Sequence, residues 1–170
     1  GGLLAESTHI AFIDDDCLPA PLYLSRLLAL VKSSSKFDIF SGTVSFPLDS
    51  INTSHYIKFR QSLLDIYPRQ VFTPCKAENA YAMNFVVNRD VFLDLLFSET
   101  FKSYGWEDQE FFFRLLNKGY CIVNSNFHVY HLEFSTFSHY VKKMMRYGYS
   151  LQQIKVTSSV FFGSLSFSSS

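Results

Sequence analysis

Three consecutive aspartates follow the apolar run 10–13 (Ile-Ala-Phe-Ile) and are the first residues along the chain that could do chemistry. Asp14 and Asp16 are separated by one residue, and their carboxylate oxygens suit a hard divalent cation. If residues 10–13 form a buried strand, these carboxylates stand at its carboxyl end, where open α/β sheets bind ligands. The alternative is an acidic loop in which Asp16 caps the following helix. A calcium EF-hand is excluded, because Pro19 and Ser25 stand where that loop needs Gly and Glu.

A second acidic pair, Glu107 and Asp108, follows Gly105 and Trp106 at the expected start of a helix. Acidic residues in the first turn of a helix are ordinary partners of the helix dipole. The functional alternative makes one of the two a general base that takes a proton from a hydroxyl nucleophile. Trp106, the only tryptophan, either stacks on a sugar ring or fills the core.

His131 ends the apolar segment Val129-Tyr130-His131. A histidine in such a place often only packs and hydrogen-bonds within the fold. Its imidazole nitrogen can also complete a mixed nitrogen and oxygen site for a manganese-like ion, in which it would join Asp16.

The elements that must position these residues alternate along the chain. Hydrophobic spacing predicts strands at residues 10–13, 38–46, 81–88, 121–123 and 127–131, and helices at 22–32, 54–67, 89–97 and 107–118. A last helix, capped by Ser135 or Thr136, is expected to run through residue 153 with an interruption near Gly148. This alternation predicts an α/β domain with a mainly parallel sheet flanked by helices.

Composition limits the classes of function. The chain of 170 residues balances 15 Lys and Arg against 15 Asp and Glu, so no overall charge draws it to nucleic acid. Three widely spaced cysteines give no disulfide framework, which favours a reducing, cytoplasmic compartment. We expect neither a membrane span nor a signal peptide, because the apolar runs are short. The basic residues Lys142, Lys143 and Arg146 form either a solvated helix face or a peripheral contact with the cytoplasmic membrane.

In this order, the segments resemble the glycosyltransferases of family 2, which have the nucleotide-diphospho-sugar transferase (GT-A) fold, including galactosyltransferase and chondroitin-polymerase-like relatives. The resemblance runs from residue 1 to about residue 153 and is carried by the ordered set of motifs rather than by any one of them. The matching segments are Gly1 with Ala5 (Gly-x-x-x-Ala, with Ser7 where a second Gly is usual), residues 10–16 (the Asp-x-Asp strand), Asn84 with Arg89 and Phe92, residues 105–115 (the Glu-Asp helix with Arg114 and Leu115), and His131.

The resemblance implies an inverting, metal-dependent transfer of a sugar from a nucleotide-diphosphate donor, a UDP-sugar, to a hydroxyl of a glycan or a lipid-linked glycan. It implies Mn²⁺ or Mg²⁺ as the cofactor. The implied roles are Asp108 and Glu107 in catalysis, Asp14, Asp15 and Asp16 at the donor, Asn84 and Trp106 at the acceptor, and Asp16, His131 and Asp14 at the metal. The Gln-x-x-Arg-Trp signature of processive synthases is missing, which favours a non-processive enzyme.

The family's first nucleotide-binding strands have no counterpart in the sequence, so we expect residues 1–155 to form a partial catalytic domain with an exposed apolar sheet edge or face. Residues 156–170, rich in Ser and Phe, are expected to be a disordered tail. The competing class is an inactive fragment or a module that binds sugar or a partner without chemistry. Retention of both acidic pairs together with His131 argues against that class.

Overall fold

The structure is a computed structural model that describes residues 2–33, 38–66, 69–99, 105–133 and 135–157, without the side chains of residue 38 and residues 150–157. Its elements in chain order are η1 (Gly2–Leu4), β1 (His9–Ile13), β2 (Cys17–Pro19), α1 (Tyr23–Ser33), β3 (Asp38–Ser45), α2 (Leu48–Thr53), α3 (His55–Asp65), η2 (Ala77–Asn79), β4 (Asn84–Asn88), α4 (Arg89–Leu95), α5 (Glu107–Asn117), β5 (Cys121–His131) and α6 (Phe137–Thr157). Most of the expected helices and strands are therefore present. The predicted tail falls largely on residues 158–170, which lie outside the described residues.

The five strands form one sheet in the order β1-β4-β3-β5-β2. Among the described strands, β3 and β5 are the only parallel neighbours, and the other three pairs are antiparallel. The prediction of a mainly parallel sheet is therefore wrong, and the α/β domain has a mixed sheet. An alternating order of elements predicts a parallel sheet only if helices connect neighbouring strands. Here β4 intervenes in sequence between β3 and β5, so no single strand-helix-strand unit joins the parallel pair.

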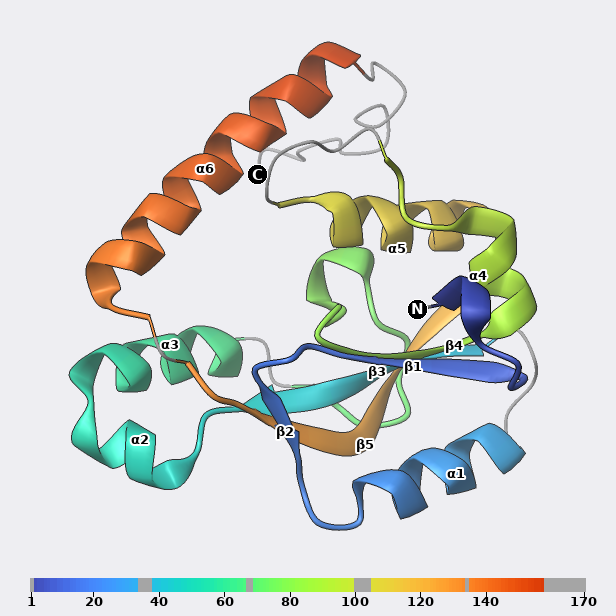
Figure 1. Cartoon of the computed structure of the whole chain (residues 1–170), viewed down its shortest axis with the longest axis horizontal. Helices are drawn as coiled ribbons and strands as arrows, with labels where there is room; N and C mark the ends of the chain where they lie inside the picture. Colours follow the sequence, from blue (N-terminus) through green and yellow to red (C-terminus); the bar gives the residue numbers. More distant parts are fainter. Residues whose placement is uncertain (1, 34–37, 67–68, 100–104, 134, 158–170) are drawn as a thin grey trace, which may run out of the picture.

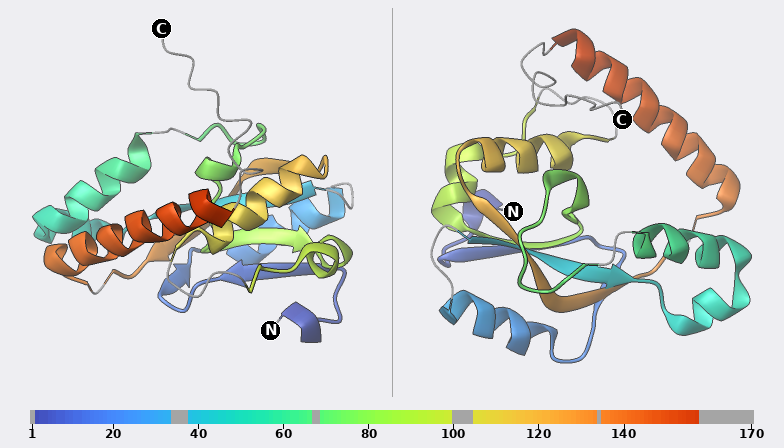
Figure 2. Two further views of the ribbon diagram at one scale, coloured as in Figure 1. Left: turned by 90° about the horizontal axis from the view of Figure 1, so that it is seen from above. Right: turned by 180° about the vertical axis from the view of Figure 1, so that it is seen from behind.

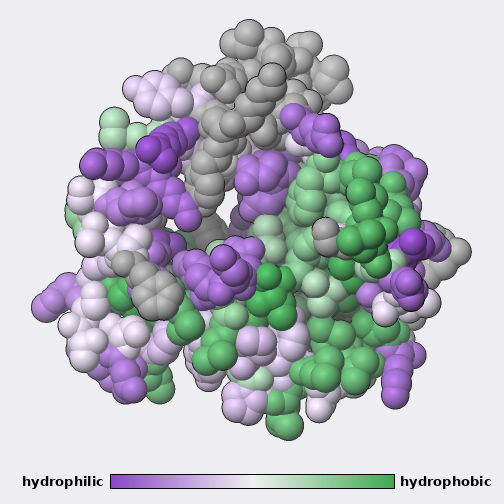
Figure 3. Space-filling model, viewed as in Figure 1, coloured by the Kyte–Doolittle hydropathy of each residue, from purple (hydrophilic) through white to green (hydrophobic). Residues whose placement is uncertain are grey.

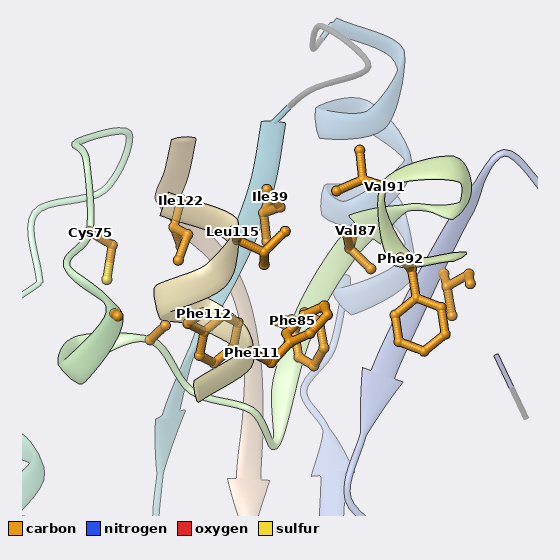
Figure 4. Packing of buried hydrophobic residues seen from close by; sticks show 13 residues of the cluster. Ile39, Cys75, Phe85, Val87, Val91, Phe92, Phe111, Phe112, Leu115 and Ile122 are labelled. Atoms are coloured by element: carbon orange, nitrogen blue, oxygen red, sulfur yellow. The ribbon is translucent and has the colours of Figure 1, made fainter. Parts of the chain in front are cut away.

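Helices cover both faces of the sheet (Figures 1 and 2). On one face, α1 packs Tyr23, Leu27 and Leu30 against β3, β4 and β5. On the other face, α4 and α5 cover a core rich in phenylalanine, in which Phe111 and Phe112 are fully buried (Figure 4). Burial of each such ring contributes about 1.5–3 kcal/mol. These layers fix the start of α5 above the carboxyl end of β1, where the acidic residues meet.

β1 is the outermost strand on its side of the sheet. Its last residue, Ile13, is 38% exposed, whereas the exposed Leu3 and Leu4 belong to η1. The expected exposed apolar edge or face stays a prediction. No helix among the described residues is long and apolar enough to cross a membrane.

Gly42 of β3 lies where no larger residue fits. A Cβ atom at this position would come within 2.2 Å of Asn84 Nδ2 and 2.5 Å of the Phe127 ring. Both neighbours are buried, and hydrogen bonds hold the Asn84 amide in place. We therefore expect Gly42→Ala to destabilise the protein by about 1–3 kcal/mol or more, measured by urea denaturation.

The matched control is Gly148→Ala in α6. Nothing lies within 4 Å of a Cβ atom built there. Alanine in an open helix position should stabilise the fold by roughly 0.5–1 kcal/mol. Equal stability of Gly42→Ala and the wild type would show that β3, β4 and β5 do not pack as described.

Candidate active site

The turn after β1 carries the aspartates to the junction of two strands. The amide of Asp14 donates to the carbonyl of Met83 (3.3 Å), and the amide of Cys17 donates to the carbonyl of Asp14 (3.1 Å). The chain then enters β2 rather than a helix, so β2 separates Asp16 from α1. Asp16 is therefore not a helix cap, and the alternative interpretation of the acidic turn does not hold.

Strand pairing brings His131 to Asp16. Cys17 of β2 is opposite His131 of β5 in the antiparallel register, and the amide of Leu132 donates to the carbonyl of Asp16 (2.7 Å). Across this pairing, His131 Nε2 lies 3.1 Å from Asp16 Oδ2. The His131 side chain is 10% exposed and that of Asp16 is 43% exposed, so the imidazole forms the inner wall and the carboxylate faces the opening.

A tight turn orients the acidic pair at the start of α5. Gly105 and Trp106 both have positive φ angles, 105° and 80°. The amide of Gly105 donates to Glu107 Oε2 (2.9 Å), so this carboxylate closes the turn. Asp108 Oδ1 accepts a hydrogen bond from the amide of Gln109 (2.7 Å), and the Asp108 side chain lines the cavity. The two neighbouring acids therefore have different environments.

These three segments surround one cavity of about 580 Å³. Figure 3 shows the surface hollowed between α6 and the rest of the molecule. The charged and imidazole side chains that line the cavity are Asp14, Asp16, Arg60, Glu78, Glu107, Asp108, His131 and Lys143. Segments that are far apart in sequence thus supply both acids and bases to a single cavity.

Burial and neighbouring charges shift the pKa values of Asp14 and Asp108, two of the acids that line the cavity. Burial, and then the Asp16 carboxylate, raise the pKa of Asp14, while His131 and Lys143 oppose this shift. Burial is also the main cause that raises the pKa of Asp108, with smaller contributions from Glu107 and Asp14. The hydrogen bond from the Gln109 amide opposes the shift of Asp108. Asp14 and Asp108 both line the cavity, so the β1 turn and the start of α5 face each other across it.

Asp16 and His131 are the residues best placed to hold a cation. Within the described part of the chain, no three His, Cys, Asp or Glu side chains form a ready-made cation site. The 3.1 Å between Asp16 Oδ2 and His131 Nε2 nevertheless fits neighbouring ligands of an octahedral ion, which lie about 3 Å apart at bond lengths of about 2.1 Å. One carboxylate and one imidazole suit Mn²⁺, and phosphate oxygens can supply further ligands.

Three of the predicted site residues lie elsewhere. The Trp106 ring stacks on Tyr147 with centroids 4.6 Å apart, and its Nε1 donates to the Tyr147 carbonyl (3.1 Å). Asn84 is fully buried and hydrogen-bonds to Tyr23 and to two carbonyls of the sheet. Asp15 is exposed. None of the three is among the described residues that line the cavity.

Arg60 of α3 is a cavity residue that the sequence did not indicate. Its Nη1 lies 2.6 Å from Glu133 Oε2 and donates to the Tyr56 hydroxyl (3.0 Å), and its guanidinium lies 4.6 Å from the centre of the Tyr140 ring. The pKa of Glu133 is lowered, because the hydrogen bonds from Ser135 and the charge of Arg60 outweigh its burial. These contacts hold α6 beside the cavity.

Tyr81 is a second cavity residue that the sequence did not indicate. The Arg69 guanidinium lies 3.3 Å from the centre of its ring. Neither Arg60 nor Tyr81 belongs to a motif, and only the packing of the loop and helices reveals them. No family model matches this chain, and no curated protein matches it.

Proposed function

We propose that this chain carries the catalytic centre of an inverting, metal-dependent, non-processive glycosyltransferase of the GT-A fold, related to family 2. The observation that carries the proposal is the meeting of Asp16 and His131 with Asp108 around one cavity. Along the chain, Asp16 follows the first strand, Asp108 opens a helix and His131 ends the last strand, which is the order of the family's motifs. A histidine that only packs in the core, an acid of a strand turn and an acid at a helix start would have no structural reason to line one cavity.

Asp16 and His131 would hold the divalent ion, with Asp14 beside them. When bound, such an ion neutralises negative charge on a diphosphate leaving group. The raised pKa of Asp14, caused by burial and by Asp16, supports this assignment, because carboxylates held this close favour a cation. Lys143 lines the same cavity and adds a second positive charge within it.

Asp108 would be the general base. Its raised pKa, caused chiefly by burial, makes its carboxylate a stronger proton acceptor than an exposed aspartate. The acceptor hydroxyl gives its proton to Asp108 while its oxygen forms a bond to the anomeric carbon. The bond from that carbon to the donor diphosphate breaks on the opposite side, so the configuration inverts. Glu107 keeps the turn at the start of α5 in place.

The cavity also offers a surface for a sugar. Its volume of about 580 Å³ falls in the range of small-molecule sites. Trp106 was expected at the acceptor, but it is Tyr81 that contributes its aromatic ring to the cavity lining. Met83 and Met144 line the same cavity. Because Arg69 fixes the plane of Tyr81, the ring is preorganised to stack on an acceptor sugar.

A donor screen tests the proposal. The purified protein should release nucleoside diphosphate from at least one nucleotide-diphospho-sugar, a UDP-sugar first, when Mn²⁺ or Mg²⁺ is present. Chelation by EDTA should abolish the release, and added Mn²⁺ should restore it, because Asp16 and His131 need the cation to hold the diphosphate. Free diphosphate is measured with a coupled enzyme assay.

Isothermal titration with UDP in the presence of Mn²⁺ separates binding from turnover. Binding without turnover, with any acceptor class, would assign the cavity to a nucleotide-sugar-binding module. Neither binding nor turnover across the common sugar nucleotides would overturn the proposed function.

A further inference from the structure

Helix α6 has two different faces. Tyr140, Lys143 and Tyr147 are partly buried, and this inner face borders the cavity and Trp106. Four apolar or aromatic residues spaced four apart form the opposite face, which we call the outer stripe: Phe137 (56% exposed), Val141 (40%), Met145 (57%) and Tyr149 (65%). Residues at this spacing lie on one side of a helix. The outer stripe therefore presents a continuous apolar surface to its surroundings.

The apolar surface continues onto α3. Phe59 is 42% exposed, and its ring centre lies 6.3 Å from that of Phe137. Figures 1 and 2 show α6 on the outside of the molecule, running from α3 towards α5. Phe59 also contacts Tyr140 of the inner face, with ring centres 6.2 Å apart, so it lies where α3 meets α6 and extends the exposed apolar surface of the outer stripe.

Positive charge runs beside the outer stripe. Lys142 and Arg146 are exposed and lie one turn apart next to Val141 and Met145. The sequence of α6, 21 residues, contains no aspartate or glutamate, although the whole chain has balanced charge. Hydrophilic side chains are visible over α6 at the upper left of Figure 3. A partner that matches both the outer stripe and the basic residues beside it is therefore both apolar and negatively charged.

We propose that the outer stripe, together with Lys142 and Arg146, docks the protein on an anionic lipid bilayer. A helix with one apolar side, basic residues along its border and a tyrosine near one end is typical of helices that lie in the membrane interface. Basic side chains are attracted by the negative surface potential of such a bilayer. An acidic protein would match the charge, but it would not require a straight stripe of exposed apolar side chains.

Docking in this orientation has a consequence for the cavity. The same helix supplies Lys143 and Met144 to the cavity lining, so the membrane surface would lie just behind one wall of the site. An acceptor carried at the membrane surface would then lie close to the cavity, separated from it by α6. This consequence rests on the proposed function, whereas the docking itself does not.

Sedimentation with lipid vesicles tests the docking. The protein should bind vesicles of phosphatidylcholine with phosphatidylserine, and should not bind vesicles of phosphatidylcholine alone. Lys142→Gln with Arg146→Gln should weaken the partition about 25-fold, since each basic residue contributes about fivefold. Val141→Asp with Met145→Asp should abolish binding, because the apolar contact is lost and the anionic bilayer repels the new carboxylates. Circular dichroism melting checks that each variant is folded.

Leu24→Asp on α1 is the matched control, because Leu24 is also exposed (63%) but lies far from the outer stripe in sequence. Its binding should equal that of the wild type, and an equal loss in this variant would overturn the proposal. Failure of the wild type to bind the anionic vesicles would also overturn it. Binding to polyglutamate but not to vesicles would assign the surface to an acidic protein instead. None of these results depends on sugar transfer, so an inactive protein can still confirm the docking.

Discussion

Replacing Asp108 by asparagine is expected to lower turnover by about 10²- to 10⁴-fold while leaving binding of the donor nucleotide unchanged. Asparagine has nearly the same shape, and its carbonyl oxygen can accept the Gln109 amide hydrogen bond that Asp108 Oδ1 accepts at 2.7 Å. It cannot take a proton from the acceptor hydroxyl. The measurement is kcat for transfer, together with titration calorimetry of the donor diphosphate in the presence of Mn²⁺.

The same substitution should not destabilise the fold at neutral pH. Burial raises the pKa of Asp108, so the folded protein holds this proton more tightly than the unfolded chain does. Its contribution to the free energy of unfolding is therefore largest below the ordinary pKa of aspartate and falls as pH rises through the raised pKa. Asparagine removes the cost of the buried charge. We expect the melting midpoint of Asp108→Asn to equal or exceed that of the wild type at neutral pH, with the difference shrinking in acid.

Asp94→Asn is the matched control for Asp108→Asn. The Asp94 side chain is 52% exposed and pairs with Lys118 on the surface, away from the cavity. Surface pairs contribute little, so this variant should keep both its turnover and its melting midpoint. Near-normal turnover of Asp108→Asn would rule out its role as the base. A loss of turnover that follows a fall in the melting midpoint would instead indicate damage to the fold.

Local pattern predicted the elements better than their connections. Helix α5 follows from acids in its first turn and apolar spacing, and Ser54 caps α3 through the amide of Ile57. β5 was predicted as two strands because its polar centre resembles a break. In the structure, Asn124 and Ser125 are buried, and Asn124 exchanges backbone hydrogen bonds with Phe72 and Thr73. A tertiary contact thus keeps the strand continuous.

The long last helix shows the same limit of local pattern. The predicted interruption near Gly148 is absent, because α6 continues through this residue. The direction of each strand could not be predicted from the local sequence pattern either, because hydrophobic spacing is the same in parallel and antiparallel strands.

The site residues that the sequence indicated stand at ends of elements, where position follows from local order. Asp16 follows β1, His131 ends β5 and Asp108 opens α5. Arg60 and Tyr140 could not be found in this way, because their part in the site depends on how α6 packs on α3. Trp106 was expected at the acceptor, but its left-handed backbone turn directs the ring onto Tyr147. Side chains positioned by long-range packing need the structure.

Asp16→Ala and His131→Ala are expected to have the second large effect, because we assign both side chains to one cation. Each variant should raise the Mn²⁺ concentration for half-maximal activity at least about 10-fold, as even partners outside the ligand set change metal affinity by about 10- to 100-fold. The double variant should be little worse than either single one, since loss of one ligand already removes the ion and the effects are then not additive. Titration of Mn²⁺ by electron paramagnetic resonance, with and without UDP, measures the binding directly.

His139→Ala is the control for this experiment, because His139 is exposed in the first turn of α6. Its Mn²⁺ dependence should match that of the wild type. The competing structural role is specific: the 3.1 Å contact between His131 and Asp16 would only tie β5 to the turn before β2. In that case both variants would lower the melting midpoint and leave the Mn²⁺ titration unchanged. That pair of results would remove the cation from this site, whereas a shifted titration with an unchanged midpoint requires that the two residues bind it.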